Sequence, residues 1–381
     1  MAKSKRILFA LRSVEHYPYV RSIVEALARR GHIVRVIFDK RWSQGRLDHV
    51  KEVRIKGITY GWAKYSEEKW RKIIFYAQDI LSWGRYFKVS GQSSFYQERY
   101  VNFLPGFLRL FIKIPAVGSL MTNSIVSGLL EELVRWAPAE DDVVSDIKDL
   151  GPDVLVATPG NMPFSSADQE YLRAAKFLKT PTVISVFSWD NLTTKGLIHI
   201  KPDLLLAWNE RQVTEAWRHH QIGKKNVKIC GAFLFDFWFE NLRPSQTREA
   251  FCKKWGLDAN APILCYLETS DSLTGDERWL VKELSHNLKN SNDLRLKAMQ
   301  IIVRPHPFKS YFGNFSFPGV YVIPKEGTWP KDKESIQLYF DTLYFSFAAF
   351  GVNTSGFIDA VCCDKPIVSL NLAQYKKTQM E

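Results

Sequence analysis

The chain has 381 residues, more than one hydrophobic core of ordinary size can organise, so its length predicts two domains. Hydrophobic residues make up 46% of the chain and charged residues 24%, a globular balance that excludes wholesale disorder. The formal net charge of +12 makes the protein basic. Which anionic partner the protein can bind depends on where this charge lies in the chain.

We expect neither export nor a membrane span. The apolar run that follows the basic first residues, residues 7–11, is too short for a signal peptide. The nearest approach to an apolar span, residues 114–130, falls short of the ~20 residues that a spanning helix needs and is interrupted by Pro115 and Gly118. Five cysteines without a CxxC spacing fit a reducing compartment. We therefore expect a cytoplasmic protein.

The first elements form a β-strand, helix, β-strand unit. Residues 6–13 read as a buried strand, and apolar residues at helical spacing predict a helix that runs to Arg30, with Gly31 as its C-cap. Residues 33–38 predict a second strand. Because the three elements fit within about 35 residues, they indicate a parallel sheet.

The alternation then lapses, and we expect a helical insert over residues 41–150. Residues 40–113 carry 15 lysines and arginines against six acidic residues, which places +9 of the net charge there. Residues 60–111 hold 15 aromatic side chains. This mixture is typical of contact with an anionic membrane or a nucleic acid, but also of an insert whose aromatics are core and whose charges are solvated. We expect no nucleic acid and keep the other two alternatives.

Strands and helices alternate again after Gly151. The sequence predicts further strands over 153–158, 182–187, 204–208 and 227–230, with helices over 166–178 and 213–220. A second series has strands over 263–267, 301–303, 320–323, 347–352 and 367–370, with helices near 276–289, 333–345 and 355–363. Two such runs predict an α/β protein with two doubly wound, Rossmann-like domains, residues 1–240 and 241–381.

Ligands of open parallel sheets bind past the carboxyl ends of the strands, so the residues there are the first candidates. Arg304 and His306 follow the strand 301–303 and alternate with Pro305 and Pro307. Two prolines hold this tip extended, and a guanidinium and an imidazole suit the oxygens of a diphosphate. The alternative is a turn with a surface arginine and a packed histidine.

A second candidate is the segment that ends the strand 347–352 and opens the next helix. Thr354 or Ser355 is a natural N-cap, and the amides at that helix start would bind an anion. Asp359 lies one turn further on, where its carboxylate could reach a ribose diol. The alternative is a plain capped helix. Together with the Arg304 tip, the segment predicts a nucleotide-diphosphate site made by the residues Asn353, Thr354, Ser355, Gly356 and Asp359.

The loop after the strand 182–187 is rich in hydrogen-bonding side chains. Asp190 is a candidate general base. Candidate contacts to a sugar or an acceptor are Trp189, Asn191, Thr193 and Lys195. The alternative is an Asx-type turn that leads into a helix. His16, in the first strand-to-helix loop, is a second candidate base, unless it is only a polar surface residue.

These segments resemble a known superfamily. Residues 27–32 are similar to the start of many GT-B glycosyltransferases. Residues 303–307, 353–359 and 365–368 resemble the branch that contains CDP-glycerol glycerophosphotransferases and capsule-type transferases. The loop 188–196 looks like a signature of an uncharacterised bacterial group concerned with surface carbohydrate. GT-B proteins usually close with a helix that crosses back, and the resemblance therefore leads us to expect a C-terminal domain cut short at its end.

The resemblance implies an enzyme that moves a sugar from a nucleotide-diphosphate sugar to a hydroxyl of a surface glycan or lipid-linked acceptor. The donor would bind in the C-terminal domain, and no metal ion or other cofactor is implied. A CDP-glycerol-type transferase shares the same motifs. A hydrolysing UDP-N-acetylglucosamine 2-epimerase shares the architecture but needs cleft carboxylates, for which Asp190 and Glu210 are the candidates. The last alternative is an inert scaffold that binds a glycan or a protein.

A lipid-linked acceptor would lie at the inner face of the membrane. Anionic lipids there attract lysine and arginine, and aromatic rings favour the headgroup layer. We therefore expect peripheral membrane association through the basic, aromatic residues 60–113.

Overall fold

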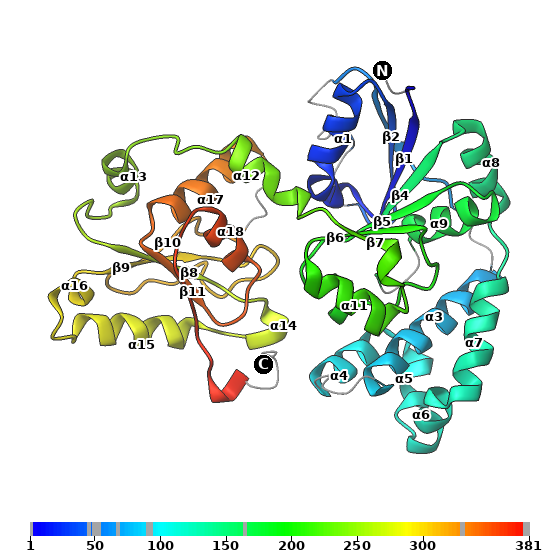
Figure 1. Ribbon diagram of the computed structural model, residues 1–381. Coiled ribbons are helices and arrows are strands. Elements are labelled where there is room, and N and C mark those ends of the chain that lie inside the picture. The colour runs from blue at the N-terminus through cyan, green and yellow to red at the C-terminus, as the bar shows by residue number, and fades with distance from the viewer. Residues whose placement is uncertain are drawn as a thin grey trace. The chain divides into compact units, whose positions relative to one another are not determined.

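The computed structural model describes residues 3–43, 47, 55–65, 69–88, 94–162, 166–327 and 332–375. They form two compact units, Met1–Asp236 and Phe237–Glu381 (Figure 1). The division falls at the start of α12 (Asp236–Glu240), four residues before the boundary drawn from the sequence.

The first unit is built on a seven-stranded sheet in which all the strands are parallel. Its order is β3-β2-β1-β4-β5-β6-β7. The strands are β1 (Arg6–Leu11), β2 (Ile33–Phe38), β3 (Ile58–Trp62), β4 (Val154–Thr158), β5 (Thr182–Ser185), β6 (Leu204–Ala207) and β7 (Val227–Ile229). Six of these strands confirm the sequence prediction. The edge strand β3 was missed because it is short, mostly half-buried and interrupted by Gly61.

Helices cover both faces of this sheet. Successive strand residues point to opposite faces, so Phe9 and Leu11 meet α1 while Leu8 and Ala10 meet α8 and α9. The helical elements are η1 (Val14–Tyr19), α1 (Arg21–Arg29), α8 (Asp141–Leu150), α9 (Ala167–Phe177), α10 (Asn191–Thr194), α11 (Glu210–His220), η2 (Lys224–Asn226) and η3 (Phe233–Phe235).

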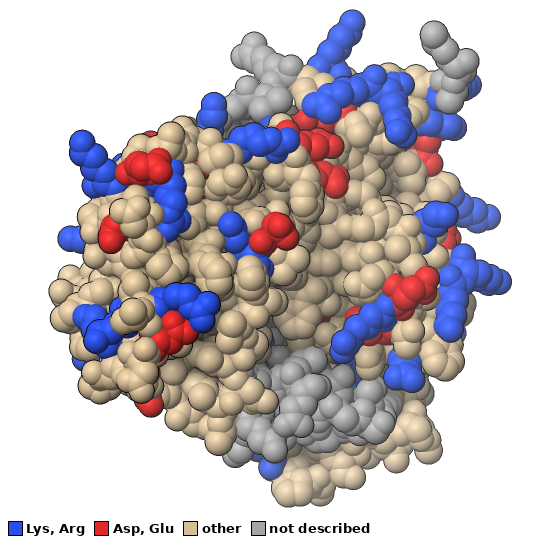
Figure 2. Space-filling model, turned by 60° about the vertical axis from the view of Figure 1, so that its left-hand side comes forward, with Lys and Arg blue, Asp and Glu red and all other residues tan. Residues whose placement is uncertain are grey.

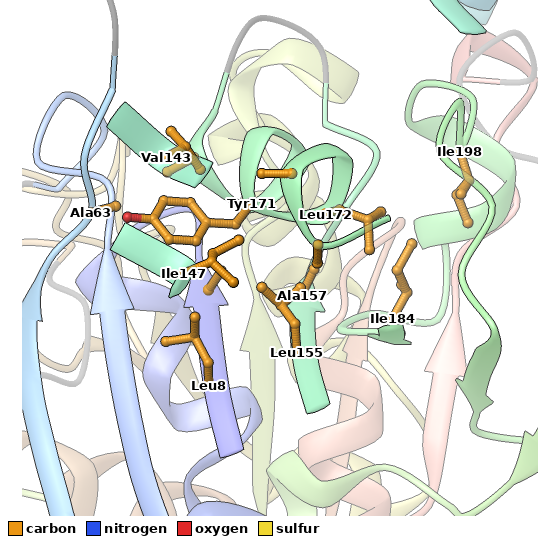
Figure 3. Packing of buried hydrophobic residues seen from close by; sticks show 14 of the residues in the cluster. Leu8, Ala63, Val143, Ile147, Leu155, Ala157, Tyr171, Leu172, Ile184 and Ile198 are labelled. Atoms are coloured by element: carbon orange, nitrogen blue, oxygen red, sulfur yellow. The ribbon is translucent and has the colours of Figure 1, made fainter. Parts of the chain in front are cut away.

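The larger core of this unit lies between the sheet and α8 and α9. The Tyr171 ring of α9 points toward Ala63, while Leu172 of the same helix lies beside Ala157 of β4 (Figure 3). Tyr171, Leu172 and Ala157 are fully buried. Burying one such large apolar side chain contributes about 1.5–3 kcal/mol to folding. The Tyr171 hydroxyl donates to Asp146 Oδ2 at 2.5 Å, so its one polar group is satisfied.

The predicted helical insert over residues 41–150 is helical from residue 69 onward, whereas residues 58–62 form the strand β3 and belong to the sheet. It comprises α3 (Lys69–Lys88), α4 (Ser94–Phe103), α5 (Gly106–Ile112), α6 (Pro115–Thr122) and α7 (Ser124–Trp136). Trp83, Tyr86 and Tyr100 are buried together with Leu104 and Ile112, so this part of the aromatic content is core. None of the helices in the described ranges combines the length and the apolar content needed to cross a bilayer.

The second unit contains a five-stranded parallel sheet of order β10-β9-β8-β11-β12. All five predicted strands are confirmed as β8 (Ile263–Leu267), β9 (Gln300–Arg304), β10 (Val320–Val322), β11 (Ala348–Gly351) and β12 (Ile367–Ser369). The helical elements are α13 (Arg248–Trp255), α14 (Asp271–Thr274), α15 (Arg278–Lys289), α16 (Leu294–Lys297), α17 (Lys333–Phe345), α18 (Gly356–Cys362) and η4 (Ala373–Tyr375). Both units are thus Rossmann-like.

We predict that Gly351→Ala destabilises the second unit by about 1–3 kcal/mol. A methyl group at Gly351 would lie 2.6 Å from the carbonyl oxygen of Leu267, and neither backbone can move within the paired strands β8 and β11. Urea unfolding followed by tryptophan fluorescence measures the change. The matched variant Gly313→Ala, where the nearest contact is 3.7 Å, should lose much less stability. Equal stability of the two variants would contradict the packing argument.

Candidate active site

A buried carboxylate ties the Arg304–His306 tip to the sheet of the second unit. Glu268 follows β8 directly and is only 3% exposed. Its two oxygens accept the backbone amides of His306 at 2.7 Å and Tyr311 at 3.1 Å. Each of these hydrogen bonds satisfies an amide that would otherwise be costly to bury, so Glu268 fixes the loop after β9.

The side chain of Arg304 lies inside the unit. Arg304 is 8% exposed, its Nη1 donates to the carbonyl oxygen of Ile323 at 2.9 Å, and its Cζ lies 4.9 Å from the centre of the Tyr339 ring. Burial lowers the pKa of Arg304, but a guanidinium stays charged at neutral pH. Arg304 therefore places a positive charge under the strand ends, and its predicted contact with a diphosphate stays a prediction.

Tyr339 links the two candidate segments of this unit. Its hydroxyl donates to Asp359 Oδ2 at 2.8 Å, while its ring receives the Arg304 guanidinium. Thr269, the second residue after β8, accepts the amide of Asn353 at 3.2 Å. The loops after β8, β9 and β11 are thus joined at the carboxyl edge of the sheet, where the sequence places the diphosphate site.

Asp359 has an ionisation near neutral pH. Dense packing around its carboxyl raises the pKa of Asp359 to about 7, and the hydrogen bond from Tyr339 only partly opposes this effect. The predicted ribose contact would use the same carboxyl that Tyr339 already binds. A mixed protonation state at pH 7 lets this group either donate or accept a hydrogen bond.

The helix start at α18 differs in detail from the prediction. Ser355 holds the N-cap position without a side-chain cap bond, and the Thr354 hydroxyl accepts the amide of Gly356 at 3.3 Å. Ser355 is exposed, while Asn353 and Thr354 are half-buried. His306 is also half-buried, and burial lowers its pKa.

In the first unit, the loop 188–196 is folded around Asp190. Asp190 accepts hydrogen bonds from Ser188 and Thr194, both at 2.6 Å, and pairs with Lys195 at 3.1 Å. Burial alone would raise the pKa of Asp190, but the charge of Lys195 and these hydrogen bonds outweigh it and lower the pKa. An ionised carboxylate with both oxygens bound is a weak base, so these contacts favour a role for Asp190 in organising the loop, and its predicted role as a general base stays a prediction.

Asn191 is used inside the same loop. It is 1% exposed; its Oδ1 accepts the amide of Phe187 at 3.1 Å, and its Nδ2 donates to Asn161 Oδ1 at 2.5 Å. The geometry therefore disfavours the predicted sugar contact by Asn191. Trp189 is 40% exposed, and Thr193 and Lys195 are half-buried, so these three remain candidates for contact with a ligand.

The insert holds this loop in place. Arg85 of α3 donates to the carbonyl oxygens of Leu192 at 3.2 Å, Thr193 at 3.0 Å and Lys195 at 2.6 Å. From α11, His220 Nδ1 accepts the amide of Ile198 at 3.0 Å, so Nε2 carries the proton that it donates to Leu192. Burial holds the pKa of His220 well below its usual value, and the ring is neutral.

His16 lies beside this loop. Its ring centre is 5.4 Å from that of Phe187, and its Nδ1 is 2.9 Å from the Ser13 hydroxyl. Burial, with a contribution from Arg12, lowers the pKa of His16 to about 4. His16 is therefore neutral at pH 7. If Nδ1 carries the proton and donates to Ser13, the Nε2 lone pair is available to accept a proton.

Sequence reasoning missed several charged residues at strand ends. Asp39, directly after β2, is fully buried and accepts the amide of Ala167 at 2.8 Å while pairing with Arg41 at 2.7 Å. Asp168 accepts the amide of Gly160 at 2.7 Å. Burial raises the pKa of Asp168. Asp39 and Glu268 each follow a strand, so the rule that selected Arg304 would also have selected them.

Other parts of the site had no signal in the sequence. Tyr339, Arg85 and Asn161 lie within helices or loops whose pattern shows nothing unusual, and only folding brings them to the strand ends. Glu210, named for an epimerase, is exposed at the start of α11. Within the described ranges, no three His, Cys, Asp or Glu side chains are grouped so that they could hold a metal ion.

The chain matches no protein-family model and no curated protein. It is similar in structure to UDP-GlcNAc 2-epimerase from Neisseria meningitidis, solved with UDP-GlcNAc bound, at 12% identity and a TM-score of 0.53, over 98% of this chain and 84% of that chain. It is also similar to UDP-GlcNAc 2-epimerase from Methanocaldococcus jannaschii, at 12% identity and a TM-score of 0.53, over 97% of this chain and 86% of that chain. A third similar structure is a glycosyltransferase from Rickettsia africae, at 12% identity and a TM-score of 0.50, over 98% of this chain and 87% of that chain. At such identities the likeness establishes the fold, which is the two-domain GT-B fold.

We predict that Asp359→Asn stabilises the second unit more at pH 8 than at pH 5. The folded pKa of about 7 lies above the ordinary value of 3.8, so the folded state binds more protons between these values and loses stability as the pH rises. Asparagine keeps an acceptor for Tyr339 and cannot ionise. The difference in unfolding free energy between the two pH values should be about 1–3 kcal/mol.

Urea unfolding of wild type and variant at both pH values measures this difference. Glu283→Gln, on the exposed side of α15, is the control for the loss of one negative charge. A gain from Asp359→Asn that does not depend on pH would show that the carboxyl ionises normally.

Proposed function

We propose that the protein is a glycosyltransferase that moves a sugar from a nucleotide-diphosphate sugar to a hydroxyl group. One observation carries the proposal: the segments 304–306 and 353–359 meet at the carboxyl edge of one sheet, joined through Tyr339, Glu268 and Thr269. The GT-B fold supports it, because a structurally similar protein was solved with UDP-GlcNAc bound.

In this proposal the donor binds to the second unit. His306 and the backbone at Thr354–Gly356 contact the diphosphate, and the charge of Arg304, held from below, favours the anion. Asn353 orients the loop, and Asp359 with Tyr339 binds the ribose hydroxyls. These groups would stabilise the leaving diphosphate, so we propose a reaction without a metal ion or other cofactor.

The acceptor binds to the first unit. Its hydroxyl oxygen attacks the anomeric carbon, the bond to the diphosphate breaks with its electron pair, and the hydroxyl proton passes to a base. We assign the base to Nε2 of His16, which is neutral at pH 7, rather than to Asp190, whose two oxygens are bound within its own loop. Trp189, Thr193 and Lys195 are the proposed acceptor contacts.

We propose a surface glycan or a lipid-linked molecule as the acceptor, with the enzyme in the cytoplasm at the inner face of the membrane. The rigid loop 188–196 supports an acceptor role, because a site that orients a hydroxyl must hold its contacts in place. A CDP-glycerol-type transfer uses the same kind of diphosphate site and stays an alternative.

We predict that His306→Ala raises the dissociation constant of UDP, GDP or CDP, whichever binds best, by about tenfold, the worth of one hydrogen bond to a charged group. Isothermal titration calorimetry measures it after a thermal-shift screen of the nucleotides. His286→Ala, an exposed histidine of α15 in the same unit, is the control and should bind like the wild type. Unchanged binding in His306→Ala would remove this histidine from the donor site.

We predict that His16→Gln lowers kcat by about 10²–10⁴-fold and leaves the KM for the donor nearly unchanged. Because the pKa of His16 is about 4, the wild-type rate should stay flat from pH 7 to pH 5 and fall only near pH 4. Steady-state rates of nucleotide release across this range test both statements. A variant with wild-type kcat would rule out His16 as the base.

A second candidate function is a hydrolysing 2-epimerase, favoured by the structural likeness to two such enzymes. The buried carboxylates Asp39 and Asp168 are better placed for it than Glu210. Asp39 directly follows β2, and Asp168, in the first turn of α9, accepts the amide of Gly160 just after β4. A panel of nucleotide sugars and CDP-glycerol separates the alternatives. Release of UDP and free N-acetylmannosamine from UDP-GlcNAc without an acceptor would identify the epimerase. Nucleotide binding without turnover of any donor would indicate the scaffold.

A further inference from the structure

Helix α5 presents an apolar face to solvent. Phe107, Leu110 and Phe111 are three and one residues apart, which places them on one side of α5, and Ile114 follows as the N-cap residue of α6. Their exposed fractions are 50%, 72%, 55% and 49%. On the opposite side, Ile112 is buried against α3 and α4.

Helix α7 repeats this arrangement. Ile125, Leu129 and Leu133 are four residues apart and are 73%, 67% and 43% exposed, and Trp136 ends the row at 79%. Helix α6 contacts both α5 and α7, and its Leu120 is 54% exposed. We call these nine side chains of α5, α6 and α7 the apolar face.

The fold does not account for the apolar face. The inner sides of α5 and α7 already pack through Ile112 and Val134. Phe107 also meets the Tyr76 ring of α3, with the ring centres 5.4 Å apart, but the other outer side chains add little to the core of the first unit. A helix that is apolar on both its inner and its outer side is ordinarily covered on both. Contiguous apolar surface of this kind marks an interaction site.

Around α5 and α6 the charge has one sign, whereas the end of α7 carries the exposed charges Glu131, Glu132 and Arg135. Between residues 106 and 130 the chain has only two charged residues, Arg109 and Lys113, and both are exposed. Neither forms an ion pair with a described residue. At the lower edge of Figure 2, most of the coloured atoms belong to uncharged residues, drawn in tan.

We propose that the apolar face docks onto a lipid bilayer whose surface carries anionic phosphate headgroups. The hydrocarbon layer of a bilayer would cover the apolar side chains Leu110, Ile125 and Leu129. Its anionic headgroups would attract the positive charges of Arg109 and Lys113. The helices are too short to span, so they lie in the interface, with the two basic side chains reaching back to the phosphates. The exposed indole of Trp136 suits the same layer.

This surface overlaps in part with the one expected from the sequence. Residues 60–113 were expected to touch the membrane, and within that range Trp83, Tyr86 and Tyr100 are buried. The face begins in α5, inside the expected range, and continues beyond residue 113 through α6 and α7. Membrane docking does not depend on glycosyl transfer, because binding to vesicles requires neither donor nor acceptor.

The experiment is sedimentation of the full chain with sucrose-loaded vesicles of phosphatidylcholine alone or with 30% phosphatidylglycerol. We expect wild type to bind the anionic vesicles and to bind neutral ones more weakly. The variant Leu110→Ser, Ile125→Ser, Leu129→Ser should bind both at least about tenfold more weakly. The variant Arg109→Gln, Lys113→Gln should lose about thirtyfold on anionic vesicles only, about fivefold for each charge.

Matched controls separate the face from general changes in surface chemistry. Phe177→Ser, Leu294→Ser removes two apolar side chains that are 68% and 79% exposed elsewhere and should bind like wild type. Lys224→Gln, Lys225→Gln removes two exposed charges of the same unit and should also bind normally. His16→Gln should bind vesicles fully, which keeps this test independent of catalysis.

Three results would overturn the proposal. One is the absence of wild-type binding to either kind of vesicle. Another is equal loss of binding in the face variant and in its control. The third is a wild type that dimerises in sedimentation velocity and loses this dimer, but no vesicle binding, in the face variant, because the face would then cover a second copy of the chain.

Discussion

Both units depend on buried carboxylates that bind the backbone of neighbouring loops. Asp39 after β2 holds the start of α9, and Glu268 after β8 holds the loop of His306. Parallel strands end at one edge, where chain segments from distant parts of the sequence meet and their amides lose water. Leaving such an amide unpaired costs about 1–3 kcal/mol, so an acceptor must stand at each strand end. The candidate sites at both sheets are therefore held by hydrogen bonds to buried carboxylates.

Burial also sets the protonation state of the candidate catalytic and binding groups. A carboxylate that accepts several hydrogen bonds, such as Asp190, stays ionised and is fixed in place. A histidine without an ionic partner, such as His16, loses its charge instead and keeps a lone pair at neutral pH. Asp359, with only Tyr339 beside it, falls between these cases with a pKa of about 7. Three titratable groups thus acquire different protonation behaviour from their surroundings.

Periodicity predicted nearly all of the fold, because buried parallel strands read as short apolar runs and their helices as amphipathic segments. The exception, β3, lies at a sheet edge and buries little. The site was predicted only in part. Positions after strands indicate which residues lie at the ligand edge, but not where a side chain points: Arg304 turns inward to Ile323, and Asn191 is used by its own loop. Tyr339 and Arg85 could not be found, because only tertiary packing brings them to the site.

The insert joins the loop 188–196 to the apolar face through one set of helices. On its inner side, Arg85 of α3 binds three carbonyl oxygens of the loop 192–195, and Ser82 of the same helix accepts the amide of Leu197 at 2.9 Å. On its outer side, α5, α6 and α7 pack on α3 and on one another and carry the apolar face. A helix hydrogen-bonded to a loop at several points cannot shift without moving that loop. Membrane contact at the outer side would therefore fix the acceptor loop relative to the lipid surface, which is what transfer to a lipid-linked hydroxyl requires.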